Sequence, residues 1–173
     1  MKDDESFRRI YSSHVRKVTA FALKRCSPED AAEAVSETFL IVWKKMDQVP
    51  DGVEALPWIY GVCRNVIRNR LRMNFRAKRL GSSLKQHFVE REPDSSVVEI
   101  NHDVEKALRT LKDSEREILQ LAIWDDLKPK EIAIVLGEPQ AAVRVKLHRA
   151  RKKLAEKLPQ YQMYQDNVIK IAN

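Results

Sequence analysis

The chain has 173 residues, of which 43% are apolar and 33% charged, with only four glycines and seven prolines. These values predict one domain or two small ones with real hydrophobic cores, and they argue against a fold built from loops. Helix-forming residues dominate, and no stretch alternates as a strand would, so we expect an all-α protein. The formal net charge of +7 favours an anionic partner, without choosing between nucleic acid and a membrane surface.

Several classes of protein are excluded by what the sequence lacks. No apolar run approaches the ~20 residues of a membrane span, and the N-terminus MKDDESFRRI has no signal-peptide core. We therefore expect a cytoplasmic protein without membrane insertion. Cys26 and Cys63 lie in predicted helices, where buried thiols usually behave as small hydrophobes, with a redox role as the alternative. The histidines show no metal-ligand spacing and no catalytic motif is visible, so we expect no metal, no cofactor and no enzyme activity.

The N-terminal part predicts two helices, over residues 4–25 and 28–46. Ser27 can cap the second helix, and the proline after it suits the first helical position. The apolar residues of the inner stripe of this second helix are Ala31, Val35, Phe39, Val42 and Met46. Its opposite face is charged but also carries Leu40 and Ile41, which indicate either a partner surface or a site that another helix covers.

A basic stretch follows. Residues 47–57 contain two prolines and a glycine and predict a loop, and a third long helix is expected to begin near Trp58. No acidic residue occurs over 55–89, whereas the basic residues there are Arg64, Arg68, Arg70, Arg72, Arg76, Lys78, Arg79 and Lys85. Like charges four residues apart weaken a helix, and a phosphate backbone is the usual reason for such a stripe. Trp58, Tyr60 and Phe75 can stack on unpaired bases; alternatively these rings are core and the arginines are solvated.

A change of composition separates this part from the rest of the chain. Residues 81–99 are rich in small polar residues and predict a flexible linker. The sign of the charge reverses over 90–105, and an acidic segment between two basic helical units indicates a domain boundary. We therefore expect one helical domain over residues 1–80, a second over 100–160, and a tail over 161–173.

The stretch 127–158 predicts two helices joined by a tight turn at Gly137, where the chain reversal needs a residue tolerant of positive φ. The apolar stripe of the second helix consists of Val143, Leu147, Ala150, Leu154 and Leu158. Its opposite side is basic. A short helix packed under a longer one with a basic outer face is a helix-turn-helix that can lie in a DNA major groove. The alternative is an ordinary α-hairpin with a solvated basic side.

Together these pieces resemble the bacterial RNA polymerase sigma factors of the extracytoplasmic-function group. The resemblance covers residues 5–158 and is carried by SETFLIVWKKM (36–46), PWIYGVCRN (57–65) and EIAIVLGEPQAAVRVKLHRARKKL (131–154). It implies an initiation factor that binds the two largest subunits of core RNA polymerase, recognises minus-thirty-five and minus-ten promoter elements and stabilises melted promoter DNA. It also implies control by an anti-sigma factor.

The resemblance assigns residues of this sequence to three surfaces. The residues implied in core polymerase binding are Glu33, Ser36, Glu37 and Leu40. Those implied in minus-ten DNA binding are Asp47, Val49, Asp51, Trp58, Arg64, Asn65, Arg68 and Arg72. Those implied in minus-thirty-five DNA binding are Gln140, Ala141, Arg144, Val145, Lys146, His148 and Arg149.

The sequence departs from the family pattern at several of these positions. Ala34 and Ser36 stand where the family usually has an acid and a glutamine. Ala141 and Ala142 replace the usual Gly-Thr, and Val145 stands where a serine is common. The lost hydroxyls could each bond a phosphate or cap the helix. Because the arginines remain, we expect the promoter sequence to differ rather than the mechanism.

Two other functions fit parts of the sequence. A conventional helix-turn-helix regulator would bind duplex DNA alone, usually as a dimer, and would not need the basic helix of the first domain or the acidic linker. A nucleic-acid enzyme such as a recombinase would need a nucleophile or metal-binding carboxylates near that basic helix, and the sequence offers none there.

Overall fold

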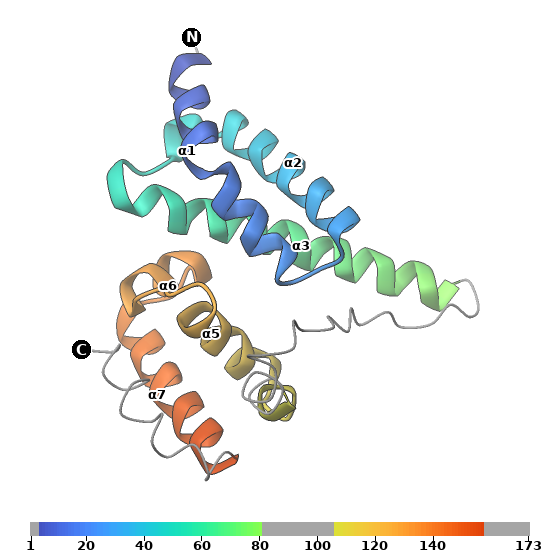
Figure 1. The fold of residues 1–173 in the computed structure, drawn as a ribbon, viewed down its shortest axis with the longest axis vertical. Helices are drawn as coiled ribbons and strands as arrows, with labels where there is room; N and C mark the ends of the chain where they lie inside the picture. The colour runs from blue at the N-terminus through green and yellow to red at the C-terminus, as the bar shows by residue number, and fades with distance from the viewer. Residues whose placement is uncertain (1–3, 81–105, 158–173) are drawn as a thin grey trace, which may run out of the picture. The chain divides into compact units, whose positions relative to one another are not determined.

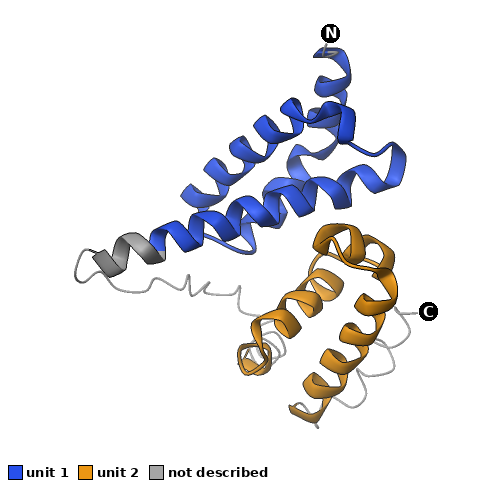
Figure 2. Ribbon diagram, turned by 180° about the vertical axis from the view of Figure 1, so that it is seen from behind, with its two compact units in different colours: residues 1–90 blue, residues 91–173 orange. Residues whose placement is uncertain are grey.

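The computed structural model describes residues 4–80 and 106–157, apart from the side chains of 75–80. In these ranges all of the regular structure is helical, which confirms the all-α prediction. The chain divides into two compact units, residues 1–90 and 91–173 (Figure 2). The predicted linker, its charge reversal and the C-terminal tail lie outside the described residues. Among the helices that are described, none combines the length and apolarity needed to cross a membrane.

The first unit consists of α1 (Asp4–Leu23), α2 (Pro28–Lys44) and α3 (Ala55–Leu80), and each of these helices packs on the other two (Figure 1). The ring of Phe21 on α1 stacks on that of Tyr60 on α3, with the centroids 4.4 Å apart. The other buried residues of this core include Val18, Ala31, Val35, Phe39, Val42, Ile59, Cys63, Val66 and Ile67. The inner face of α3 is thus buried under two helices, which leaves its other face to solvent.

The start of α2 follows the prediction from the sequence. The Ser27 hydroxyl oxygen accepts a hydrogen bond from the backbone N–H of Asp30 at 3.2 Å, and Pro28 occupies the first helical position. The predicted inner stripe is confirmed for the residues within the helix, which are Ala31, Val35, Phe39 and Val42. Met46 lies beyond the end of α2 and is only half-buried. The cap and the apolar stripe together orient the outer face of α2.

The connection between α2 and α3 contains two 3-10 turns, η1 (Met46–Gln48) and η2 (Gly52–Glu54). The helix α3 begins at Ala55, three residues before the start predicted near Trp58. Pro57 falls in the first turn of α3, where backbone N–H groups have no intrahelical partner, so a proline there does not interrupt the helix. The prediction of a loop up to this proline was wrong.

The second unit contains the helical residues 106–109, α5 (Asp113–Ile123), α6 (Pro129–Leu136) and α7 (Gln140–Lys157). Both α5 and α6 pack on α7. The buried residues of this core include Leu108, Leu111, Ile118, Leu119, Leu121, Ile132, Val135, Val143, Leu147, Ala150 and Leu154. The predicted apolar stripe of the last helix is therefore confirmed, except at Leu158, which lies outside the described residues.

The turn between α6 and α7 is built as the sequence predicted. Gly137 has a φ of +66°, in the left-handed region, and the next backbone N–H, of Glu138, donates to the carbonyl oxygen of Ala133 at 3.0 Å. The carbonyl of Pro139 accepts a hydrogen bond from the N–H of Val143 at 3.1 Å. The proline therefore caps α7 and precedes its first residue. With α6 and α7 joined this way, the second unit contains a helix-turn-helix.

Candidate nucleic-acid interface

The outer face of α7 carries the residues predicted to contact duplex DNA. Of these, Ala141, Arg144, Val145, Lys146, His148 and Arg149 are exposed, and Gln140 is half-buried. At 100° per residue, Val145, Arg149 and Lys152 lie opposite the buried stripe. Val145 keeps 49% of its surface exposed in the middle of this face. The helix thus presents cations around an apolar centre, which suits contacts to phosphates and to base edges in a major groove.

Lys146 differs from its neighbours because an acidic side chain already holds it. Its Nζ donates to Oε1 and Oε2 of Glu138 at 2.8 and 2.6 Å. Lys153, seven residues later on the same flank of α7, donates to Oε1 of Glu115 on α5. The hydrogen bond from the Lys153 ammonium lowers the pKa of Glu115. One flank of α7 is therefore held to the preceding elements by two lysine–glutamate pairs.

The outer face of α3 carries the predicted arginine stripe. Arg68, Arg72 and Asn65 are exposed, and Arg64 is half-buried. The guanidinium of Arg64 donates to the side-chain oxygen of Asn65 at 3.4 Å. The repeat of four residues corresponds to about 6 Å along the helix axis. This face is therefore cationic and polar over successive turns, and Leu71, which is 41% exposed, lies at its edge.

The loop before α3 contributes the remaining residues predicted for minus-ten DNA. Asp47 and Asp51 are exposed, whereas Val49 and Trp58 are half-buried. Val53, in the second 3-10 turn, is 86% exposed, which is the highest value among the large apolar residues described. Sequence reasoning missed Val53, because a valine in a loop has no periodic neighbours that assign it to a face.

The outer face of α2 carries the residues predicted to bind core polymerase. Glu33, Ser36, Glu37 and Leu40 are all exposed. Leu40 keeps 52% of its surface accessible, so no helix of the described residues covers it. The sequence left open whether Leu40 and Ile41 form a partner surface or are covered by another helix. The exposure of Leu40 favours the partner surface.

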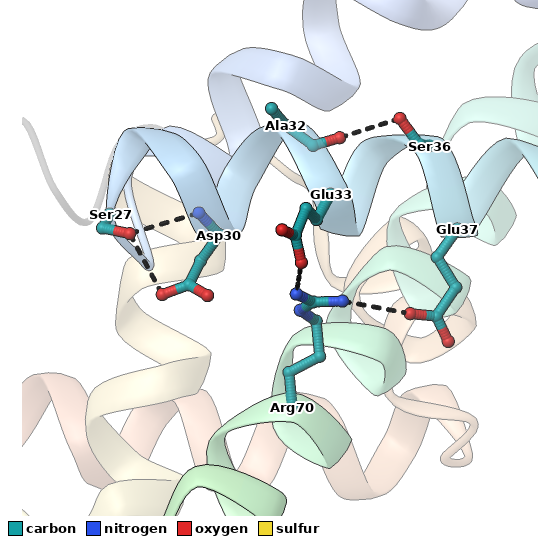
Figure 3. Close-up of polar contacts among 7 residues, drawn as sticks. All are labelled: Ser27, Asp30, Ala32, Glu33, Ser36, Glu37 and Arg70. Atoms are coloured by element: carbon teal, nitrogen blue, oxygen red, sulfur yellow. Dashed lines mark hydrogen bonds and ion pairs between the residues drawn. The ribbon is translucent and has the colours of Figure 1, made fainter.

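An ion-pair cluster joins this face to α3. Arg70 extends from α3 between Glu33 and Glu37, pairs with Glu33, and places Nη1 3.6 Å from Oε2 of Glu37 (Figure 3). The sequence grouped Arg70 with the cations available to nucleic acid, and the structure corrects this assignment. The sequence did contain a signal for this role. Arg70 lies seven residues, or about two helical turns, after the buried Cys63, which places it at the edge of the buried stripe of α3.

The two departures from the family pattern on α2 have different surroundings. The Ser36 hydroxyl is exposed and donates to the carbonyl of Ala32 at 3.0 Å (Figure 3). Ala34 is fully buried between the helices. Only Ser36 can therefore alter a surface contact directly, because Ala34 acts through packing.

Both cysteines are free thiols in protected surroundings. Cys63 is buried, Cys26 is half-buried, and burial is the main cause that raises the pKa of each, to about 11 for Cys26. The thiolate is the reactive form, so both side chains are poorly reactive near neutral pH. These surroundings favour the interpretation of both cysteines as packing residues.

Comparison with known families assigns each unit separately. The profile described as Sigma-70 region 2 matches residues 10–77, and the profile described as Sigma-70, region 4 matches residues 101–154. Together the two matches span most of the chain. The chain therefore belongs to the sigma-70 family, in agreement with the resemblance seen in the sequence.

Individual relatives support the same assignment. The protein named Probable RNA polymerase sigma factor RfaY, from Xanthomonas campestris, is 29% identical over 164 residues, and the match covers 90% of this chain and 41% of RfaY. The ECF RNA polymerase sigma factor BldN from Streptomyces coelicolor is 28% identical over 161 residues, covering 90% of this chain and 61% of BldN. The chain thus spans less than two thirds of the length of either relative.

A solved structure shares the fold. The sigma factor RpoE from Bartonella quintana, crystallised with the anti-sigma factor NepR, superposes with a TM-score of 0.63 at 22% sequence identity. The superposition covers 90% of this chain and 98% of RpoE.

Proposed function

We propose that this chain is a transcription initiation sigma factor that binds core RNA polymerase, recognises a two-part promoter and has no catalytic activity of its own. The observation that carries the proposal is a pair of exposed basic helical faces, one in each unit of a sigma-70 family chain. Arg68 and Arg72 lie on the face of α3, and Arg144 and Arg149 on that of α7. A regulator that read duplex DNA through its helix-turn-helix alone would need only α7.

In this proposal α7 reads the minus-thirty-five element in the duplex. The N-terminal half of the second helix of a helix-turn-helix meets the base edges, while contacts to phosphates set its register. Arg144 and Arg149 can contact phosphates or the acceptors of guanine, and His148 adds a further polar group. Gln140, Ala141 and Val145 complete the surface. An apolar valine in place of a serine favours contact with a thymine methyl group.

The face of α3 and the loop before it hold the melted minus-ten strand. Arg64, Arg68 and Arg72 follow the backbone with Asn65 beside them, while Trp58 and the loop residues Asp47, Val49 and Asp51 surround unpaired bases. We add Val53 to this set because it is the most exposed large apolar residue described. Stacking of a base on an aromatic side chain is worth about 1–3 kcal/mol. Held bases therefore offset the stacking lost when the duplex opens.

The outer face of α2 binds core polymerase. Leu40 provides an exposed aliphatic centre, and Glu33, Ser36 and Glu37 surround it with acidic and polar groups. A partner surface that is apolar at its centre and basic at its rim would complement it. Since core polymerase is the partner, the protein acts in the cytoplasm. By similarity to RpoE, which was crystallised with NepR, we further propose control by an anti-sigma factor.

Run-off transcription tests this function. Purified core polymerase is assayed with and without the protein on promoter fragments from its own genome. A discrete transcript that appears only when both are present supports the proposal and reveals the promoter sequence. If there is no transcript and no co-elution with core polymerase, but the protein alone binds a specific duplex, then it is a conventional helix-turn-helix regulator. Strand cleavage or joining by the protein alone would indicate a nucleic-acid enzyme.

A further inference from the structure

The turn of the helix-turn-helix places an acidic side chain at the start of α7, where DNA phosphates are expected. The backbone N–H of Glu138 is bonded to the carbonyl of Ala133, Gly137 precedes it and Pro139 follows it. The backbone at this position is therefore well constrained. A free carboxylate here would repel the phosphates that the start of α7 otherwise attracts through its N–H groups and its dipole.

Lys146 neutralises this carboxylate. It lies about two turns along α7, and its side chain reaches back toward the turn, in the direction in which helical side chains tilt. The two contacts from Nζ, at 2.8 and 2.6 Å, engage both oxygens of Glu138. The side chains of Lys146 and Glu138 remain 52% and 32% exposed, so the pair forms at the surface and needs no partner to assemble.

A DNA phosphate gains little by displacing Glu138 from this lysine. Such an exchange would leave the Glu138 carboxylate uncompensated close to a polyanion, so the attraction of Lys146 is offset by a new repulsion. The other cations of the outer face, Arg144, Arg149 and Lys152, have no ion-pair partner among the residues that the structure describes. These three can neutralise phosphates without any such exchange.

We propose that Glu138 is a specificity-determining residue, which keeps Lys146 off the DNA backbone and so limits binding to non-promoter duplex. This inference rests on the proposed reading of duplex DNA by α7. Phosphate contacts strengthen binding to every sequence equally, whereas base contacts discriminate. Holding Lys146 in this ion pair therefore lowers non-specific affinity and leaves discrimination to the outer face around Val145.

Salt dependence of binding tests the proposal, because its slope counts the phosphates that the protein neutralises. The full chain bound to core polymerase is titrated with the promoter duplex found by run-off transcription and with a scrambled duplex of the same composition. The variants are Glu138→Gln, Lys146→Met and the double variant. Glu115→Gln is the matched control, because it also removes an acid that is paired with a lysine on the same flank of α7, farther from the start of the helix.

Glu138→Gln should steepen the slope of log affinity against log salt by roughly one and strengthen binding to the scrambled duplex by roughly three- to tenfold. The ratio of promoter to scrambled affinity should fall. Lys146→Met should weaken binding to both duplexes, because it leaves the Glu138 carboxylate uncompensated near the phosphates. The double variant should return to the wild-type slope, and Glu115→Gln should not steepen it.

A direct phosphate contact by Lys146 would give a different pattern and overturn the proposal. In that case Glu138→Gln would not steepen the slope, and the double variant would stay shallower than the wild type by roughly one. Equal slopes for all variants would also overturn it, while leaving the sigma function intact. Failure of the wild-type holoenzyme to prefer the promoter duplex would instead overturn the proposed function and this inference with it.

Discussion

Two long basic helices, α3 and α7, invite comparison because each presents a basic face in its own unit. In both helices, some of the cations form ion pairs within the protein. On α3, Arg70 pairs with an acidic side chain of α2. On α7, Lys146 pairs with Glu138 in the turn and Lys153 with Glu115 on α5. The faces that remain differ in chemistry. The face of α3 is a stripe of arginines beside an asparagine, whereas the face of α7 surrounds an exposed valine. A mainly cationic stripe suits a backbone, and a face with an apolar centre suits base edges as well.

The largest expected effect tests whether the two units fold around separate cores. Leu147, which is 2% exposed on α7, belongs to the core of the second unit. Leu147→Ala should lower the free energy of unfolding of that unit by about 2–5 kcal/mol, because it removes buried methyl groups and leaves a cavity. Hydrogen exchange resolved along the chain measures it. The exposed Lys152→Ala should change stability by at most about 0.5 kcal/mol. Equal destabilisation of both units would contradict separate cores.

The next effect separates the two nucleic-acid faces. Arg149→Ala should weaken binding to the minus-thirty-five duplex, and Arg68→Ala should weaken capture of the minus-ten single strand, each by about 1–3 kcal/mol. Neither change should affect the other probe. Fluorescence anisotropy of the holoenzyme on each probe measures both. Arg8→Ala, an exposed arginine on α1, serves as the control. If both variants transcribe normally, the assigned faces are wrong.

A smaller effect concerns the apolar centre of the α7 face. If Val145 contacts a thymine methyl group, replacing thymine by uracil in the minus-thirty-five duplex should weaken binding by about 1 kcal/mol, the value of roughly one buried methyl group. The Val145→Ala variant should bind both duplexes nearly equally. Competition binding with the two duplexes measures the difference. Wild-type protein that does not distinguish them would contradict a methyl contact.

The smallest effect concerns the ion pairs between α2 and α3. Arg70→Met should lower the free energy of unfolding of the first unit by at most about 1 kcal/mol, since Glu33 and Glu37 are largely exposed and exposed ion pairs contribute little. Urea denaturation measures it. Arg72→Met, which changes an exposed arginine nearby, provides the reference for stability. A loss of several kcal/mol would show that Arg70 supports the packing of α3 and not only its charge balance.

Much of the fold was predictable because its signals are local. The serine cap and proline at the start of α2, the glycine turn at 137 and the apolar stripe of α7 each depend on a few neighbouring residues. The prediction failed at Pro57, because a proline in the first turn of a helix has the same sequence appearance as a proline in a loop. The assigned partner surfaces were chosen by resemblance and by helical periodicity, and their roles stay predictions.

Local periodicity by itself determined that this protein is helical, that its two parts each present a basic helical face, and that one part contains a helix-turn-helix. Only the tertiary structure decided which cations remain available on those faces. Arg70 and Glu33 are far apart in the sequence, and Lys146 meets Glu138 only because the chain reverses at Gly137. An ion pair depends on the distance between charges in space, and sequence separation does not determine that distance once the chain turns back on itself.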